Sequence, residues 1–117
     1  MKNFTICEFR DFCDNLNPKS FIFTNREVLG GFGEPVSTGT NQNPDILLHF
    51  DSIAFVVSPF NPSIRLYDSS NPDYGAILCC VTSILYDGTC SLGDIYNVIG
   101  YINDSNRCGI IGTIFVN

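Results

Sequence analysis

The sequence is poor in positive charge and in histidine, a side chain that often serves as general base or metal ligand. It has six Lys and Arg against twelve Asp and Glu, one His and no Trp, and its formal net charge is −6. Direct binding to nucleic acid is disfavoured, because phosphate contacts need clustered Lys and Arg. No segment approaches the roughly eighteen uninterrupted apolar residues of a membrane-spanning helix.

The N-terminal segment lacks the apolar run of a signal peptide. Glu8, Arg10 and Asp11 follow too soon for a run of secretory length to form. We therefore expect a cytoplasmic, intracellular protein without membrane contact, in which the six cysteines are reduced.

The remaining composition is that of a folded chain. Of the 117 residues, 44% are hydrophobic and 15% are charged, which differs from the strongly polar composition of disordered proteins. A chain of this length supports one hydrophobic core, so residues 1–117 are expected to form a single globular domain.

A short N-terminal helix is predicted from Ile6 to Leu16. Thr5 and Glu8 have the spacing of a capping box, in which each side chain accepts a hydrogen bond from the other residue's backbone N–H. Apolar residues recur at helical spacing from Phe9 onward, and Pro18 disfavours continuation of the helix.

Most of the later apolar runs have the length and composition of strands. They are Phe21–Thr24, Ser63–Asp68, Ala76–Asp87, Asp94–Ile102 and Cys108–Val116. Residues 46–57 fit either one helix or two strands. The short polar connections favour antiparallel pairing, because a parallel pair needs a crossover of about a dozen residues or more. The predicted fold is α+β, with the short N-terminal helix packed on a five- to six-stranded antiparallel sheet or small barrel.

A Gly-rich segment at residues 30–44 separates the early elements from the later ones. Gly-rich nucleotide loops are followed by a helix, and P-loops also contain Lys, whereas Glu34 and Pro35 follow the glycines here. We interpret the segment as a long irregular loop and as one candidate contact surface, and the sequence leaves open whether it is ordered.

The cysteines lack the spacing of a zinc site, in which paired ligands lie about two to four residues apart. Cys79 and Cys80 are adjacent in a predicted strand, so their side chains must face opposite sides of it. Both sides of that strand are largely apolar, and we expect both thiols to be buried as small hydrophobic groups. No metal and no other cofactor are predicted.

Cys90 and His49 are the residues from which a catalytic site could be built. Cys90 is expected in an exposed polar turn, where Asp87 and Asp94 disfavour a reactive thiolate. His49 is the only available base for a Cys–His pair, and in the apolar sequence LLHFD it is expected to be a packed side chain. A small enzyme or small-ligand-binding domain that uses Cys90 or His49 is therefore the alternative function.

The charges are unevenly distributed along the chain. Residues 1–27 carry four acidic and four basic side chains, whereas residues 28–106 carry eight acidic side chains against Arg65 alone. Five of the acidic residues lie at predicted turns, where Asp bonds nearby backbone N–H groups. They are Asp68, Asp73, Asp87, Asp94 and Asp104. Turn chemistry explains the choice of Asp but not the scarcity of Lys and Arg, so we predict that these five residues form an acidic face.

The predicted function is that of a small, non-catalytic interaction protein. Its acidic face suits a basic protein surface, such as the nucleic-acid-binding surface of a larger protein. An inhibitor of a host nuclease, of the kind that viruses and phages encode as accessory proteins, would have these properties. The sequence does not determine the partner or the oligomeric state.

Overall fold

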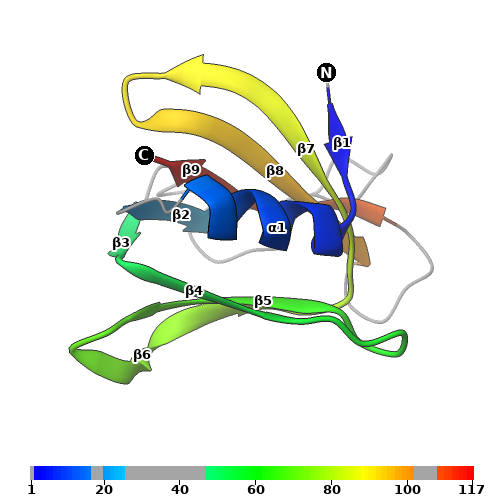
Figure 1. Cartoon of the computed structure of the whole chain (residues 1–117), viewed down its shortest axis with the longest axis horizontal. Coiled ribbons are helices and arrows are strands. Elements are labelled where there is room, and N and C mark those ends of the chain that lie inside the picture. The colour runs from blue at the N-terminus through cyan, green and yellow to red at the C-terminus, as the bar shows by residue number, and fades with distance from the viewer. Residues whose placement is uncertain (1, 17–19, 26–46, 102–107) are drawn as a thin grey trace.

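One helix and nine strands make up the part of the chain that this computed structural model describes, residues 2–16, 20–25, 47–101 and 108–117 (Figure 1). The helix is α1 (Ile6–Leu16). The strands are β1 (Asn3–Phe4), β2 (Phe21–Asn25), β3 (Leu48–Phe50), β4 (Ser52–Val56), β5 (Ser63–Asp68), β6 (Asn71–Leu78), β7 (Val81–Cys90), β8 (Gly93–Tyr101) and β9 (Cys108–Val116). Their pairings are antiparallel.

The strands form two sheets. The first has six strands in the order β1-β7-β8-β9-β2-β3, and the second has three in the order β4-β5-β6. The prediction of a short helix combined with antiparallel strands is confirmed. The strands are divided between two sheets, however, and the six-stranded sheet is open and not a barrel.

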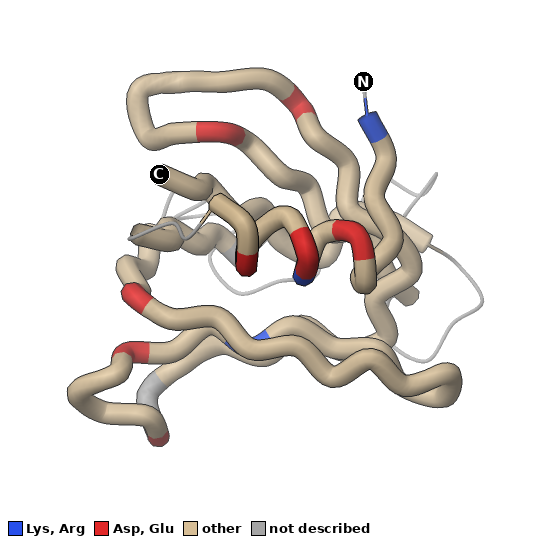
Figure 2. Tube along the Cα trace, in the orientation of Figure 1, with Lys and Arg blue, Asp and Glu red and all other residues tan. Residues whose placement is uncertain are grey.

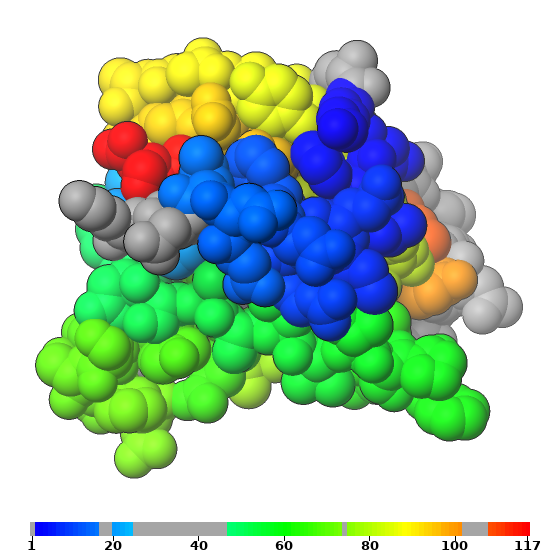
Figure 3. Space-filling model, viewed as in Figure 1, coloured from blue at the N-terminus to red at the C-terminus, as the bar shows by residue number. Residues whose placement is uncertain are grey.

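The helix has the predicted bounds and packs against both sheets. Its capping box is formed, because Thr5 N donates to Glu8 Oε1 at 2.9 Å and Glu8 N donates to Thr5 Oγ1 at 3.1 Å. On the buried side, the ring centroid of Phe9 lies 5.9 Å from that of Phe55 on β4 and 5.0 Å from that of Tyr96 on β8. Figure 3 shows α1 lying across the junction between the two sheets.

A shared hydrophobic core lies between α1 and the two sheets. Its largest fully buried side chains are Phe9, Phe21, Ile64, Leu66, Ile84, Val98 and Ile114. Those on strands belong to the inward-facing side of the two-residue alternation. Burying a side chain of this kind contributes about 1.5–3 kcal/mol.

Strand β9 lies inside the first sheet, between β8 and β2. This pairing places Thr113 beside both Asn97 and Thr24. Thr113 Oγ1 donates to Asn97 Oδ1 at 2.8 Å, and Asn97 Nδ2 donates to Asp87 Oδ2 at 3.1 Å. These bonds link β9, β8 and β7 on the side of the sheet that faces away from α1, and both Asn97 and Thr113 are buried.

Residues 46–57, for which the sequence allowed a helix or two strands, contain the strands β3 and β4. The strand β3 pairs with β2 in the first sheet, and β4 pairs with β5 in the second, so the chain changes sheets at Asp51. The Asp51 carboxylate accepts hydrogen bonds from Ser69 N at 2.8 Å, Ser69 Oγ at 2.6 Å and Ser52 Oγ at 2.9 Å. These bonds attach the bend to the turn between β5 and β6.

The predicted strand Ala76–Asp87 is interrupted at Cys79 and Cys80, where the chain returns to the first sheet. Cys80 has a positive φ of 57°, a left-handed conformation that is incompatible with a continuing strand. Its backbone N–H donates to Asn61 Oδ1 at 3.0 Å. Both thiols are exposed, so the prediction that they are buried on opposite faces of a strand is wrong.

Candidate protein-binding surface

Four of the five predicted acidic residues lie in the described part of the chain, in two groups. Asp87 and Asp94 were predicted at turns but lie within β7 and β8, the two strands of a hairpin in the first sheet, because both strands extend further than the sequence pattern suggested. Asp68 is the last residue of β5 and Asp73 lies on β6, both in the second sheet. Figure 2 shows acidic positions on the hairpin and on the second sheet, with α1 between them. Asp104 lies outside the described residues.

Both acidic residues of the hairpin accept a hydrogen bond from a neighbouring strand. Asp87 Oδ2 accepts from Asn97 Nδ2 at 3.1 Å, and Asp94 Oδ1 accepts from Thr89 Oγ1 at 2.8 Å. An Asn side chain also has an acceptor oxygen. Replacement of either Asp by Asn therefore removes the charge while the hydrogen bond can remain.

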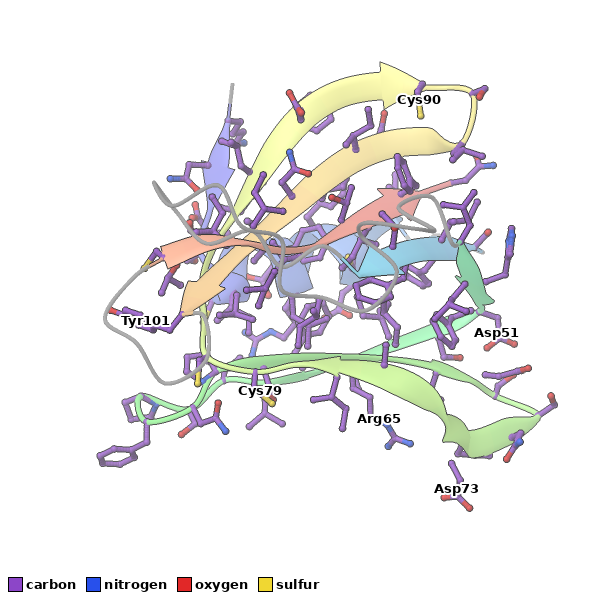
Figure 4. The ribbon with its side chains drawn as sticks, turned by 180° about the vertical axis from the view of Figure 1, so that it is seen from behind. Asp51, Arg65, Asp73, Cys79, Cys90 and Tyr101 are labelled. Carbon is purple, nitrogen blue, oxygen red and sulfur yellow. The ribbon has the colours of Figure 1, made fainter. Side chains whose placement is uncertain are left out.

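The two acidic residues of the second sheet have different surroundings. Asp68 Oδ1 accepts hydrogen bonds from Ser70 N at 3.2 Å and Ser70 Oγ at 2.9 Å, as expected for a turn. Asp73 was predicted in a turn but belongs to β6, because the strand already begins at Asn71. Figure 4 shows its side chain pointing away from the body of the protein, on the same side as Arg65.

The exposed side of α1 carries three acidic side chains that the predicted face did not include. Glu8, Asp11 and Asp14 follow one another at three-residue spacing, and all three are exposed. Arg10 Nη2 lies 3.4 Å from Asp11 Oδ1. This ion pair is exposed, and exposed ion pairs contribute little to stability. The three-residue spacing of these acidic residues can be read from the sequence. The acidic row was missed because residues 1–27 as a whole carry equal numbers of acidic and basic side chains.

Acidic side chains outnumber basic ones on the described surface by eight to three. The acidic residues are Glu8, Asp11, Asp14, Asp51, Asp68, Asp73, Asp87 and Asp94, and the basic residues are Lys2, Arg10 and Arg65. The Lys2 ammonium lies 4.9 Å from the ring centroid of Phe4, and the Arg65 guanidinium lies 5.0 Å from that of Tyr67. The described surface therefore carries a net negative charge.

A hollow of about 270 Å³ lies among the end of α1, β2, the start of β4 and β5. It is lined by Cys13, Asp14, Phe21, Asp51, Ser52, Ile53 and Tyr67. Its volume is below the roughly 300–1,000 Å³ of typical small-molecule sites. Two of the lining side chains, Asp14 and Asp51, are carboxylates.

Hydrogen bonding and burial determine the protonation states in this hollow. The hydrogen bonds from Ser69, together with that from Ser52, lower the pKa of Asp51 from its usual 3.8, so its carboxyl is ionised at neutral pH. Burial raises the pKa of Cys13 to about 12, and the charge of Asp14 adds to this effect. Cys13 is therefore a neutral thiol and not a nucleophile.

The six cysteines are all free thiols. Cys13 is buried and Cys7 is half-buried on α1, whereas Cys79, Cys80, Cys90 and Cys108 are exposed. The predicted exposure of Cys90 is confirmed, but Cys90 is the last residue of β7 and not part of the turn itself. The thiols that are buried or half-buried thus lie on α1, whereas the four thiols on or between the strands are exposed.

His49 does not have the predicted packed environment. It lies exposed on β3, because Leu48 and Phe50 on either side of it face inward and the alternation of the strand turns His49 outward. Neither His49 nor Cys90 lines the hollow beside α1. The structure thus does not place these two residues together in that hollow.

Within the described ranges, no three His, Cys, Asp or Glu side chains are arranged to hold a metal ion. No helix in the same ranges is long and apolar enough to cross a membrane. The Gly-rich segment at 30–44, the other candidate contact surface, lies outside the described residues. No protein-family model, curated protein or solved structure matches this chain.

Proposed function

We propose that this protein is a non-catalytic interaction protein whose acidic surface binds a basic surface of a larger protein. The acidic surface is defined as the acidic side chains of α1, of the β7–β8 hairpin and of the adjoining end of the second sheet. They are Glu8, Asp11, Asp14, Asp51, Asp68, Asp87 and Asp94. Asp73 is not included, because it points away from the body of the protein on the outer face of the second sheet (Figure 4).

The proposal is carried by the excess of acidic over basic side chains in the described part of the chain, eight against three, with seven of the eight belonging to the acidic surface. Hydrogen bonds to Asp51, Asp68, Asp87 and Asp94 fix four of the carboxylates in defined positions. Fixed charges of one sign favour a complementary surface, because less side-chain freedom is lost on binding. A protein that normally binds phosphate groups presents such a basic surface, and an inhibitor of a host nucleic-acid-processing protein is a function of this kind.

The first experiment is capture of binding proteins from the cells in which the chain occurs, followed by their identification. The association rate with the purified partner is then measured at increasing salt concentration. Long-range attraction between exposed charges is screened over about 8 Å at physiological ionic strength, so association should slow as salt rises while dissociation changes less.

Three double variants then test how far the acidic surface extends. They are Asp87→Asn with Asp94→Asn on the hairpin, Asp11→Asn with Asp14→Asn on α1, and Asp51→Asn with Asp68→Asn at the second sheet. Slower association in all three supports one continuous surface. Association that is indifferent to salt and to every variant would refute the proposal.

A further inference from the structure

Strand β4 presents the longest unbroken edge in the described part of the molecule. Its five residues pair in regular register with β5, its one strand neighbour among the described residues. The other edge strands are shorter or irregular, since β1 and β3 have two and three residues and the pairing of β6 with β5 shifts register. Proteins usually protect an edge strand with charge or proline, because its outward N–H and C=O groups can pair with another chain. The sequence of β4, SIAFV, contains neither.

The helix α1 lies beside this edge and runs in the opposite direction. The ring centroid of Phe9 lies 5.9 Å from that of Phe55. Asp14, near the end of α1, lines the same hollow as Ser52 and Ile53 at the start of β4. Figure 1 shows α1 and β4 at the front of the molecule, and in Figure 3 the atoms of α1 lie directly above those of the second sheet. A strand added to β4 is therefore bordered by the helix on the inner side of the second sheet.

Carboxylates are in excess on the part of the molecule that borders this edge. Glu8, Asp11 and Asp14 are exposed on α1, and Arg10, which pairs with Asp11, is the one basic residue of the helix. Asp51 adds a further carboxylate immediately before β4. Figure 2 shows acidic positions along the side of α1 that is turned toward the second sheet. A strand whose positive side chains point toward α1 is therefore electrostatically complementary to this edge.

The two faces of β4 have different surroundings. Ile53 and Phe55 pack against the core, whereas Ala54 and Val56 are exposed on the outer face of the sheet. Arg65 is also exposed on that face, on β5 opposite Ala54. Because side chains alternate along a strand, an added strand turns every second residue toward α1 and the others toward the outer face. The outer face, which is apolar with a cation nearby, favours apolar residues there.

We propose that β4 binds an extended segment of a partner protein as a fourth strand of the second sheet, and that this segment alternates basic and apolar residues. Its Lys or Arg side chains lie toward α1, and its apolar side chains cover Ala54 and Val56. Alternate residues of a strand lie about 6.7 Å apart, and the row from Glu8 to Asp14 spans about 9 Å along the helix axis, so two successive basic residues both meet carboxylates.

The sequence argues against a second copy of this chain as the occupant. Its six Lys and Arg residues are never fewer than seven positions apart, so no segment of it has basic residues at alternate positions. The inference rests on the proposed function and specifies the form of the partner. In strand addition, main-chain hydrogen bonds provide affinity and the alternate side chains provide specificity.

The test is isothermal titration calorimetry of the full chain with synthetic peptides at low salt. The probe is a peptide of alternating lysine and valine, matched in length to β4. Its control has the same composition with the lysines and the valines in two blocks, which keeps the charge but places lysines on both sides of an extended strand. The alternating peptide should bind about tenfold more tightly or better, which corresponds to about 1.4 kcal/mol.

Two N-methylated forms of the alternating peptide test the backbone pairing without any change to the protein. One form is methylated at the lysine nitrogens and the other at the valine nitrogens, so each loses the N–H groups along one edge of the strand. A strand pairs with β4 along one edge only. One form should therefore bind like the unmodified peptide, and the other should bind about tenfold more weakly or worse.

Variants of the protein test the part played by α1. Asp11→Asn with Asp14→Asn should weaken binding of the alternating peptide about threefold or more, because exposed ion pairs are lost. Asp73→Asn with Asp87→Asn removes the same charge at sites away from β4 and should have a smaller effect. Circular dichroism of each variant checks the fold. Equal effects of the two double variants would overturn the role given to α1.

Equal binding of the alternating and block peptides, or of the two methylated forms, would overturn strand addition at β4. Self-association of the chain that the alternating peptide reverses would assign the edge to a second copy and would also overturn it. The proposed function is tested separately by the association rate with the captured partner at increasing salt, which does not depend on strand addition. A salt-dependent rate together with equal binding of the peptides would leave the proposed function standing and remove this inference alone.

Discussion

Replacement of Asn97 by Asp should destabilise the protein strongly at neutral pH. In the wild type, Asn97 Nδ2 donates to the Asp87 carboxylate at 3.1 Å. The variant loses this hydrogen bond to a charged acceptor, which is worth about 1.5–3 kcal/mol. Two unit charges 3.1 Å apart repel by about 5 kcal/mol at an effective dielectric constant of about 20, and the exposure of Asp87 reduces that figure. We expect a net loss of about 3–5 kcal/mol, which is a large part of a typical stability of 5–15 kcal/mol.

This loss should decrease in acid, because one of the two carboxyl groups can then carry a proton and donate a hydrogen bond to the other. The pKa of the introduced carboxyl is raised in the folded state above its unfolded value of about 3.9. Its penalty is therefore absent below that pH and grows as the pH rises through the folded-state pKa. Urea denaturation of the variant and the wild type at neutral pH and at about pH 4 measures the loss in free energy of unfolding under each condition.

Thr113→Val is the matched control. It removes the donor to Asn97 Oδ1 with little change in shape and should cost about 1–3 kcal/mol without any dependence on pH. If Asn97→Asp were as stable as the wild type, or if its loss were the same at both pH values, the hydrogen-bonded chain across β7, β8 and β9 would be refuted.

Three further predictions concern single residues. In thermal melts, Cys80→Gly should be at least as stable as the wild type. Cys80→Val should be less stable by about 1 kcal/mol or more, because a β-branched residue disfavours the positive φ of this position. Equal melting temperatures of the two variants would contradict the left-handed conformation. The pKa of Asp51 is lowered on folding, so its contribution to stability is present above its usual 3.8 and is lost as the pH falls through the lower folded value. Asp51→Asn should therefore flatten the acid limb of a stability–pH profile, and an unchanged profile would argue against the bonds from Ser69. The pKa of Cys13 is raised to about 12, so this thiol should resist iodoacetamide in the folded protein, whereas the exposed Cys90 should react. Mass spectrometry of the labelled chain measures both reactions, and early labelling of Cys13 would contradict its burial.

The helix was predictable because its determinants are local. Thr5 and Glu8 form the N-terminal cap within one turn, and both hydrogen bonds are present in the structure. The apolar stripe that contains Phe9 sets the buried side. No residue far away in the sequence is needed to position either end, so the sequence determined both bounds.

The division into two sheets depends on contacts between distant residues, and the sequence pattern did not reveal it. The apolar run through Cys79 and Cys80 is consistent with one long strand, and the bond from Cys80 N to Asn61, nineteen residues earlier, supports the break. The exposure of His49 was missed for a related reason. The face of the sheet on which His49 lies depends on the pairing of β3 with β2, which comes from a distant part of the sequence. Of the acidic surface, the residues on the hairpin and on β5 were predicted, whereas Asp51 and the row on α1 were not. The row on α1 was missed because charge was counted by segment and not by helix face.

The interior position of β9 has a consequence for folding during synthesis on the ribosome. Residues 52–78 contain the whole second sheet, so that sheet can assemble as soon as these residues have left the exit tunnel. The first sheet cannot, because β2, made early, has to wait for residues 112–116 before it gains its neighbour on one side. Until then the edges of β2 and β8 stay open in the nascent chain, which slows completion of the fold and exposes both strands to wrong pairing. A chain shortened within β9 would thus lose an inner strand of the six-stranded sheet, and the remaining strands would be left as a three-stranded group, β1-β7-β8, and a separate pair, β2-β3.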